Sequence, residues 1–271
     1  MWTEELFHVS KPIIALLHLR PLPGDPLYEN SSMNHVIEIA REELHALLEG
    51  GVDGILIANE FSLPYEKKVS HVTVAAMGRI VGELKKEIRV SFGVNIVSNP
   101  IATIDLAAAT DADFVRSTFT GAYIGENGLT DTNIPETLRR KKALGLNHLK
   151  LLYKVNPESD VYLAERSLEK ITKSMIFHCF PDGLCVSGSS AGQETDSSLV
   201  QRVKAVAGNT PVFCNTGCTQ ANIMEKLKDC DGACVGTAFK KDGKFENYVE
   251  RERVKAFMDV VREYRQCIGK D

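Results

Sequence analysis

The stretch VFCNTGCTQANIMEKLKDCDGACVGTAFKKDG, residues 212–243, decides the fold. Two short apolar runs, at 211–214 and 232–235, predict strands, and the residues between them predict a helix. Each run ends in a turn of small polar residues with glycine. If the strands are parallel neighbours, the two turns lie side by side, and their N–H groups can approach an anion without an intervening Cβ. The last two loops of a (β/α)8 barrel bind phosphate in this way, although ordinary strand-to-helix turns share this composition.

The same alternation runs along the whole chain. Further strands are predicted at 12–19, 54–59, 90–97, 113–118, 148–155 and 183–187. Further helices are predicted at 33–49, 72–86, 101–110, 135–144, 163–180, 196–207 and 247–267. Residues 119–133 form a long stretch with three glycines, which indicates a lid or binding loop. Eight strand-and-helix units without a linker predict one α/β domain, a (β/α)8 TIM barrel spanning residues 1–271.

Composition narrows the class of protein. The 271 residues carry a net charge of −4, which argues against nucleic acid as the main partner. No apolar stretch is long enough to cross a bilayer, and the first residues are too polar for a signal peptide, so we expect a cytoplasmic protein with no membrane partner. The seven cysteines include no CxxC pair, and we interpret them as small buried hydrophobes rather than a zinc site. The sequence leaves open whether the chain forms a homo-oligomer.

Several longer motifs resemble one known family. They are HLRPLPGDP at 18–26, NEFSLPY at 59–65, FGVN at 92–95, FTGAY at 119–123, DTN at 131–133, VSG at 186–188, NTG at 215–217 and GTAFKKDG at 236–243. Together they resemble the BtpA/SgcQ family, and more closely its SgcQ-like bacterial branch, whose genes lie beside sugar phosphotransferase components. The resemblance implies a barrel but no established reaction. The photosystem I role of the cyanobacterial branch is not carried over to this chain.

Polar side chains follow nearly every predicted strand. Because the carboxyl ends of parallel strands meet at one face of a barrel, we expect these side chains to converge on a substrate. The predicted substrate-binding residues are Arg20, Asn59, Asn95, Arg116, Asp131, Lys154 and Asn215. The alternative for Asp131 is a cap on the helix that follows it.

A phosphate site is predicted on the loops after the last three strands. Backbone N–H groups would grip the anion, with Lys240 or Arg116 adding charge. The predicted phosphate-binding residues are Ser187, Gly188, Thr216, Gly217, Gly236, Thr237 and Lys240. Lys240 can equally belong to a solvated turn.

Three residues are candidates for catalysis: His18, Glu60 and Lys150. A carboxylate beside an imidazole can move protons at neutral pH, although His18 can also be a hydrogen-bonded core histidine. Lys150 can form an imine with a carbonyl substrate or hold it electrostatically. We expect no cofactor, although His18, Glu60 and Asp131 can together hold a divalent metal.

The residues favour an enzyme acting on a small phosphorylated sugar or nucleotide-like metabolite, as an isomerase, epimerase or aldolase. Two alternatives stay open. One is a non-catalytic barrel that binds a metabolite or partner as an assembly factor or regulator, and the other is a metal-dependent hydrolase.

Overall fold

A computed structural model describes residues 1–29, 32–188 and 192–268. Within them, eight parallel strands close into a barrel in the order β1-β11-β10-β9-β7-β4-β3-β2. The strands are β1 (Ile13–His18), β2 (Gly54–Ala58), β3 (Ser91–Asn95), β4 (Phe114–Ser117), β7 (Lys150–Lys154), β9 (Gly183–Val186), β10 (Val212–Cys214) and β11 (Gly232–Val235). Spatial order follows chain order, and β11 pairs with β1 to close the ring. The predicted TIM barrel is confirmed.

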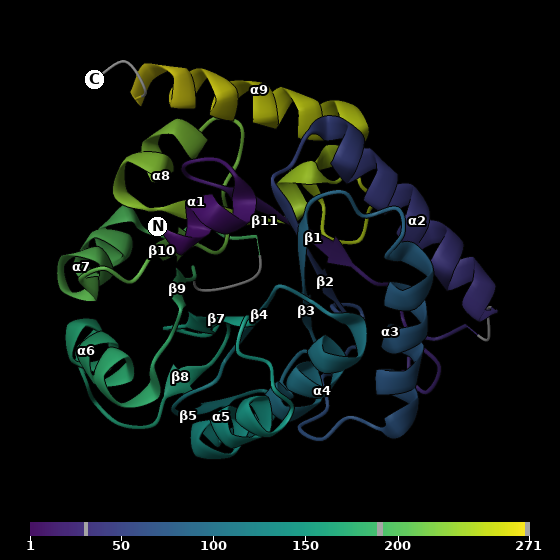
Figure 1. Cartoon of the computed structure of the whole chain (residues 1–271), viewed down its shortest axis with the longest axis horizontal. Helices are drawn as coiled ribbons and strands as arrows, with labels where there is room; N and C mark the ends of the chain where they lie inside the picture. Colours follow the sequence, from purple (N-terminus) through teal and green to yellow (C-terminus); the bar gives the residue numbers. More distant parts are fainter. Residues whose placement is uncertain (30–31, 189–191, 269–271) are drawn as a thin grey trace.

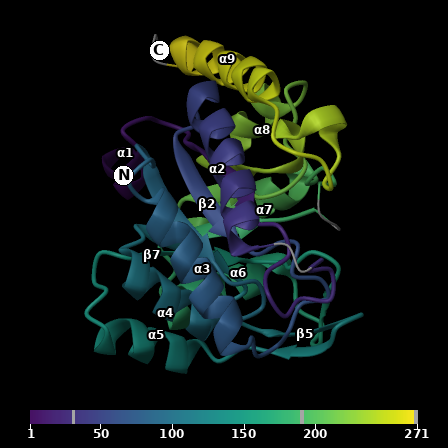
Figure 2. The ribbon, with the colours of Figure 1, turned by 90° about the vertical axis from the view of Figure 1, so that its right-hand side faces the viewer.

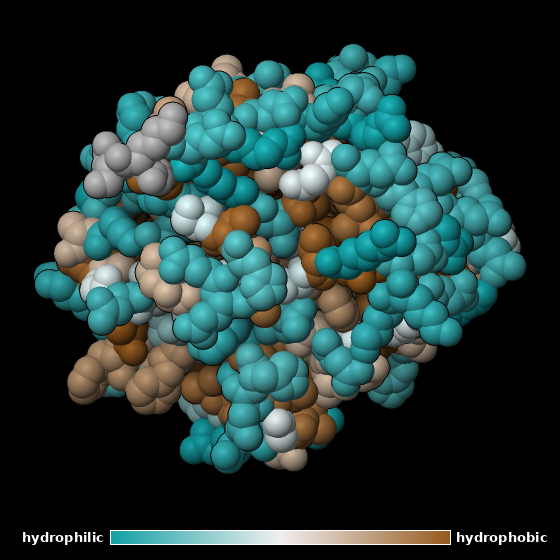
Figure 3. Space-filling view, turned by 45° about the horizontal axis from the view of Figure 1, so that its top comes forward, coloured by the Kyte–Doolittle hydropathy of each residue, from teal (hydrophilic) through white to brown (hydrophobic). Residues whose placement is uncertain are grey.

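Helices surround the barrel (Figure 1). They are α2 (Met33–Gly50), α3 (His71–Leu84), α4 (Pro100–Thr110), α5 (Ile134–Ala143), α6 (Leu168–Cys179), α7 (Ser197–Ala207), α8 (Ile223–Asp229) and α9 (Arg251–Ile268). Along the chain, α2 to α8 each lie between two barrel strands, and α9 follows the last strand. Their apolar faces pack on the outside of the strands, in one continuous cluster of buried residues. Hydrophilic side chains cover most of the face in Figure 3, as expected when helices turn their apolar sides inward.

Local sequence explains where the helices begin and end. At the start of α2, the Ser32 side chain accepts a hydrogen bond from the backbone N–H of His35, which satisfies one of the free donors of the first turn. Gly51 ends the same helix in the left-handed conformation, with φ 85°. No helix in the described ranges is long and apolar enough to span a membrane.

The inside of the barrel is filled by a second, smaller apolar cluster. Alternate residues of the strands point inward and supply it, among them Leu16, Leu56, Phe114 and Phe213. Gly93 makes room for Phe114, because a Cβ at this position would lie 2.5 Å from the phenylalanine ring. The interior of the barrel is therefore a packed core here, and a cavity has room only toward the carboxyl ends of the strands.

A short helix that sequence reasoning missed, α1 (Trp2–Phe7), closes the amino end of the barrel. The Phe7 ring packs edge-on against Phe114 with 5.7 Å between centroids, and Trp2 donates its indole N–H to the carbonyl of Asp182. Figure 2 shows α1 and the N-terminus on one side of the barrel, with β5 on the other.

The long stretch at 119–133 forms a hairpin of β5 (Ala122–Gly125) and β6 (Gly128–Asp131). A two-residue strand, β8 (Val161–Tyr162), extends it to a small antiparallel sheet in the order β6-β5-β8. This segment follows β4 at the carboxyl end of the barrel (Figure 2). Sequence reasoning identified its unusual length but not its strands.

Candidate active site

A cavity of about 420 Å³ opens above the apolar core, at the carboxyl ends of the strands. It lies mainly over β1, β10 and β11 and under the first turns of α9, after two short helical turns, η1 (Thr237–Phe239) and η2 (Lys241–Gly243). The polar and glycine residues among its described walls are His18, Glu60, Arg116, Glu158, Gly192, Asn215, Thr216, Gly217, Thr219, Gln220, Gly236, Thr237, Gly243, Glu250, Glu252 and Arg253.

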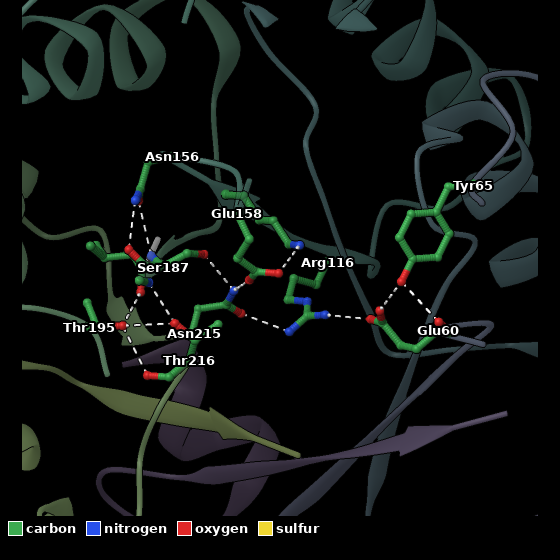
Figure 4. A network of polar contacts seen from close by, with 12 residues as sticks. Glu60, Tyr65, Arg116, Asn156, Glu158, Ser187, Thr195, Asn215 and Thr216 are labelled. Atoms are coloured by element: carbon green, nitrogen blue, oxygen red, sulfur yellow. Dashed lines mark hydrogen bonds and ion pairs between the residues drawn. The ribbon is translucent and has the colours of Figure 1, made fainter. Parts of the chain in front are cut away.

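A buried arginine is at the centre of a polar network on the cavity wall (Figure 4). The Arg116 side chain, from β4, donates from Nη1 to Oδ1 of Asn215 at 2.8 Å. Its Nη2 lies 3.4 Å from Oε1 of Glu60, which follows β2. Tyr65 donates its hydroxyl to Oε2 of Glu60 at 3.0 Å. Burial, followed by the charge of Glu60, raises the pKa of Tyr65, so the phenol stays protonated and remains a donor.

The amide of Asn215 extends the network to the other side of the arginine. Its Nδ2 donates to Oε1 of Glu158 at 3.0 Å and to Oγ of Ser187 at 2.8 Å. Asn215 therefore uses its carbonyl for the cation and its NH₂ for two acceptors, which fixes the orientation of the amide. Glu158 lies on the loop after β7, and its Oε2 is 3.7 Å from Nζ of Lys154.

His18, the last residue of β1, lines the cavity with only 4% of its surface exposed. Neither ring nitrogen has a hydrogen-bond partner among the described residues. Burial, and then the positive charges of Lys240 and Arg116, hold the pKa of His18 well below its usual value, so the ring is neutral at pH 7. The predicted alternative, a hydrogen-bonded core histidine, does not fit, because buried polar atoms without a partner are uncommon unless a ligand supplies one.

The turns after β10 and β11 form another part of the cavity wall. Gly217, Thr237 and Ala238 line it, and their backbone N–H groups donate to no acceptor in the described ranges. Gly236 lies so close to His18 that a Cβ would be 2.8 Å from the imidazole Cε1. Arg253, in the first turn of α9, donates from Nε to the carbonyl of Ala238 and brings a guanidinium to the same wall.

Of the predicted phosphate-binding residues, Thr216, Gly217, Gly236 and Thr237 lie on the cavity and Ser187, Gly188 and Lys240 do not. The N–H of Gly188 donates to Oγ1 of Thr216 at 2.6 Å, and that of Ser187 donates to Oδ1 of Asn156 at 3.0 Å. The expectation that the last three strands share the anion is therefore wrong. Among the described residues that line the cavity, the turns after β10 and β11 present free donors, on Gly217, Thr237 and Ala238.

Lys240 and Arg20 hold the loop before α9 rather than a ligand. Lys240 is fully buried and donates to the carbonyl of Phe245 at 2.7 Å, and burial lowers its pKa to about 8. Arg20 lies just beyond the end of β1, so the alternation that brings His18 inward does not extend to it. Its guanidinium packs on the rings of Phe61 and Tyr248 and donates to the carbonyl of Glu246.

Four other predicted substrate-binding residues do not reach the cavity. Asn59 is buried and accepts from the backbone N–H of Val97, whereas Asn95 is buried with its Oδ1 unpartnered among the described residues. Asp131 is exposed on the hairpin, where it pairs with Ala122. Lys154 lies at the end of β7 and reaches the site only through Glu158.

The prediction that Lys150 acts on the substrate is wrong, because this residue does not lie at the cavity. Lys150 is the first residue of β7, so it lies at the amino end, opposite the cavity. Its Nζ is 3.6 Å from Oδ1 of Asp182 and 5.7 Å from the centroid of the Trp2 ring in α1. Lys150 lies inside the predicted strand 148–155, and the alternation of side chains along a strand does not tell at which end of the barrel a residue lies.

No metal site is formed by the described residues. The proposed trio of His18, Glu60 and Asp131 is broken up, because Asp131 lies on the hairpin, and no group of three His, Cys, Asp or Glu in the described ranges can hold an ion. The cysteines are free thiols, and those at 185, 214, 218, 230 and 234 are buried.

Of the cavity residues that the sequence did not predict, the two that matter most for the proposed chemistry are Glu158 and Arg253. Glu158 lies in an irregular loop, and Arg253 belongs to a helix whose start was predicted four residues early. The only signal for Glu158 was its position a few residues beyond a strand, which many solvent-exposed residues share, and the sequence held no signal for Arg253.

Comparisons with known proteins agree with this architecture. The protein SgcQ of the sgc region in Escherichia coli is 47% identical over 98% of this chain and 99% of its own. The photosystem I biogenesis protein BtpA of Synechocystis is 29% identical over 96% of this chain and 91% of its own. A solved structure of (S)-3-O-geranylgeranylglyceryl phosphate synthase from Thermoplasma acidophilum, in complex with sn-glycerol-1-phosphate, superposes with a TM-score of 0.61 at 14% identity, covering 97% of each chain.

The sequence model of the BtpA family matches residues 9–263, nearly the whole barrel. With a relative of 47% identity along 98% of its length, the chain belongs to the BtpA family.

Proposed function

We propose that this protein is a cytoplasmic enzyme that moves a proton on a small phosphorylated metabolite, as an isomerase or epimerase. One observation carries the proposal. A single cavity brings an unpartnered neutral imidazole, His18, and a buried guanidinium, Arg116, together with the carboxylate of Glu60. Free backbone donors, on Gly217 and Thr237, line another part of the same cavity.

The two parts of the cavity suit two parts of one ligand. Backbone N–H groups and the Arg253 guanidinium are donors that phosphate oxygens accept well. The other part offers a carboxylate that can take a proton and cationic or neutral donors that can stabilise the resulting oxyanion. The similar fold of the glyceryl phosphate synthase was solved with a phosphorylated substrate, sn-glycerol-1-phosphate.

The cavity favours enolisation over aldol cleavage through an imine. An imine requires a lysine at the reacting carbonyl, and none of the described residues that line the cavity is a lysine. Lys150, the candidate for that role, lies at the other end of the barrel.

A non-catalytic binding role is the second candidate, because the relative in Synechocystis is named for photosystem I biogenesis. Glu60→Gln distinguishes the two. The variant keeps the size and one acceptor of the side chain but cannot act as a base. An enzyme should lose turnover while retaining ligand binding, whereas a binding protein should show no turnover with either chain.

Thermal shift with paired ligands tests the phosphate site. Each sugar phosphate, such as ribose 5-phosphate or glucose 6-phosphate, is compared with its free sugar. We expect the melting temperature to rise with the phosphorylated member only. Equal responses within every pair would overturn the proposal.

A pair of variants places the anion. Arg253→Gln removes the guanidinium on the cavity, and we expect it to weaken binding of the phosphorylated ligand roughly tenfold, since a charged hydrogen bond is lost. Arg251→Gln is the matched control, because Arg251 lies two residues earlier, does not line the cavity, and pairs with Glu49 and Glu252. Equal effects of both variants would place the anion elsewhere.

A further inference from the structure

Glu158 is supported in the same manner as Glu60, although the two come from different strands. Glu158 follows β7, where one oxygen accepts from the Asn215 amide at 3.0 Å and the other lies 3.7 Å from the Lys154 ammonium. Glu60 follows β2, where one oxygen accepts from the Tyr65 hydroxyl and the other faces the Arg116 guanidinium. Each carboxylate therefore has one neutral donor and one cation, and each lines the cavity.

The two carboxylates lie on opposite sides of Arg116 (Figure 4). Barrel order explains this arrangement, because β4, which carries the arginine, lies between β7 and β2 in the sheet. The loop after β7 therefore approaches the guanidinium from one side, and the residue after β2 approaches it from the other.

Between them, the site has unused hydrogen-bonding capacity. Nε of Arg116 is buried and has no hydrogen-bond partner within the described ranges, and both nitrogens of His18 are in the same state. Buried polar atoms of this kind are costly unless a ligand pairs with them, and the neutral His18 ring can donate from one nitrogen and accept at the other. A substrate carbonyl oxygen in this position would face a guanidinium and an imidazole, with a carboxylate on either side of its neighbouring carbon.

We infer that Glu60 and Glu158 form a two-base pair that acts on opposite faces of one carbon next to a carbonyl, so that the reaction is an epimerisation. This inference rests on the proposed function and specifies its stereochemistry and substrate class: a sugar phosphate with an epimerisable carbon beside its carbonyl.

The step balances without a co-reactant. One glutamate, ionised, takes the proton from the C–H bond, whose electron pair becomes the C=C bond of an enolate while the carbonyl π pair moves to oxygen. The oxyanion accepts from Arg116 and His18. The other glutamate, protonated at the outset, gives its proton to the opposite face. No atom is oxidised or reduced, and exchange with solvent restores the two carboxyl groups.

Deuterium exchange tests the pair. The probes are three epimer pairs: D-ribulose and D-xylulose 5-phosphate, D-fructose and D-allulose 6-phosphate, and D-glucose and D-mannose 6-phosphate. Each is incubated in D₂O with wild type, Glu60→Gln, Glu158→Gln and, as the matched control, Glu165→Gln, an exposed glutamate on the same loop segment as Glu158. NMR measures deuterium at the carbon beside the carbonyl and conversion to the epimer.

We expect wild type and the Glu165 variant to interconvert at least one pair, and both cavity variants to lose interconversion by about 100- to 10,000-fold. Glu60→Gln should still exchange the proton of one epimer, and Glu158→Gln that of the other. A thermal shift with the same probes checks that both variants fold and bind.

Two results would overturn the two-base pair. In one, a single glutamate variant loses exchange from both epimers while the other variant keeps exchange from both, which indicates a single base. The other is stabilisation by the sugar phosphates without exchange in any pair, which leaves the phosphate site intact and removes only this inference. If no sugar phosphate stabilises the protein, the proposed function itself fails, and the inference fails with it.

Discussion

The two ends of the barrel differ in how far their buried and half-buried polar groups find partners within the chain. At the amino end, α1 closes the barrel, Lys150 pairs with Asp182, and the Trp2 indole donates to a carbonyl. At the carboxyl end, His18 and the Nε of Arg116 are buried with no partner among the described residues, and a cavity of about 420 Å³ lies beside them.

The difference separates groups that serve stability from groups that serve a ligand. Both ends bury polar atoms, and burial without a hydrogen bond costs about 1–3 kcal/mol for each group. At the amino end Nε of Arg265 is also buried without a partner among the described residues, but the other nitrogens of that guanidinium bind Asp53 and the carbonyl of Lys11. At the open end both nitrogens of an imidazole are without a partner among the described residues, so this end has hydrogen-bonding capacity in reserve. Substitutions at either end of the barrel test this difference.

The largest effect is expected from Phe114→Ala, which opens the closed end. Phe114 is fully buried in the barrel interior and packs on Phe7 of α1. Removing its ring leaves a cavity that rigid strands cannot fill, so the free energy of unfolding should fall by about 3–5 kcal/mol. Urea unfolding measures it, with Phe177→Ala as control, since Phe177 is 75% exposed. Equal losses in both variants would contradict a packed interior.

The next largest effect is a pH dependence of the free energy of unfolding, caused by His18 at the open end. Burial, together with Lys240, Arg116 and Arg20, lowers the pKa of His18 in the folded chain against the opposing charge of Glu158, while the unfolded value is about 6.5. Below pH 6.5 the unfolded chain binds a proton that the folded chain does not. Stability should therefore fall as pH drops from 6.5, by up to about 1.4 kcal/mol per pH unit, and His18 should contribute no slope above it.

Comparison with His18→Leu isolates this contribution from that of other titrating groups. Urea unfolding of both proteins is measured between pH 5 and pH 8, and the difference in their free energies of unfolding is plotted against pH. A difference that stays flat through this range would show that His18 titrates normally or has a partner in solution.

A smaller effect is expected from the same variant at pH 8, where His18 is neutral in both states. Leucine is close to histidine in volume and removes two buried nitrogens that lack partners, so the protein should gain about 1 kcal/mol while losing turnover. Thermal unfolding measures the gain. A loss of stability would instead support the core-histidine alternative, in which the ring makes a hydrogen bond that the fold requires.

The sequence predicted the barrel because its strands are short, near-continuous apolar runs that end in turn residues. The run at 12–19 became β1, and that at 232–235 became β11 with the same bounds. Shorter elements carry too few residues for a period to show. This explains why six-residue α1 and two-residue β8 were missed.

The site was harder to predict than the fold, because distance from a cavity is a tertiary property. Proximity to the end of the first strand predicted His18 correctly, but it also predicted Arg20, which lies beyond the last residue of β1. The glycine turns placed Gly217 and Gly236 at the cavity, yet nothing in the sequence showed that the N–H of Gly188 is already taken by Thr216. Glu158 became a candidate only through its contact with Asn215.

The smallest effect is expected from Lys150→Met, at the closed end. The variant keeps the length of the apolar stem and removes one partly exposed ion pair, with Asp182, and one cation–π contact, with Trp2. Such pairs contribute about 0.2–1 kcal/mol, so unfolding should shift slightly, and sugar phosphate binding should not change. The contrast with Glu60→Gln is direct, because both remove one charge from a residue that sequence reasoning assigned to catalysis. If Lys150→Met abolished turnover while Glu60→Gln preserved it, the chemistry would lie at the closed end, and the difference between the two ends would have no functional meaning.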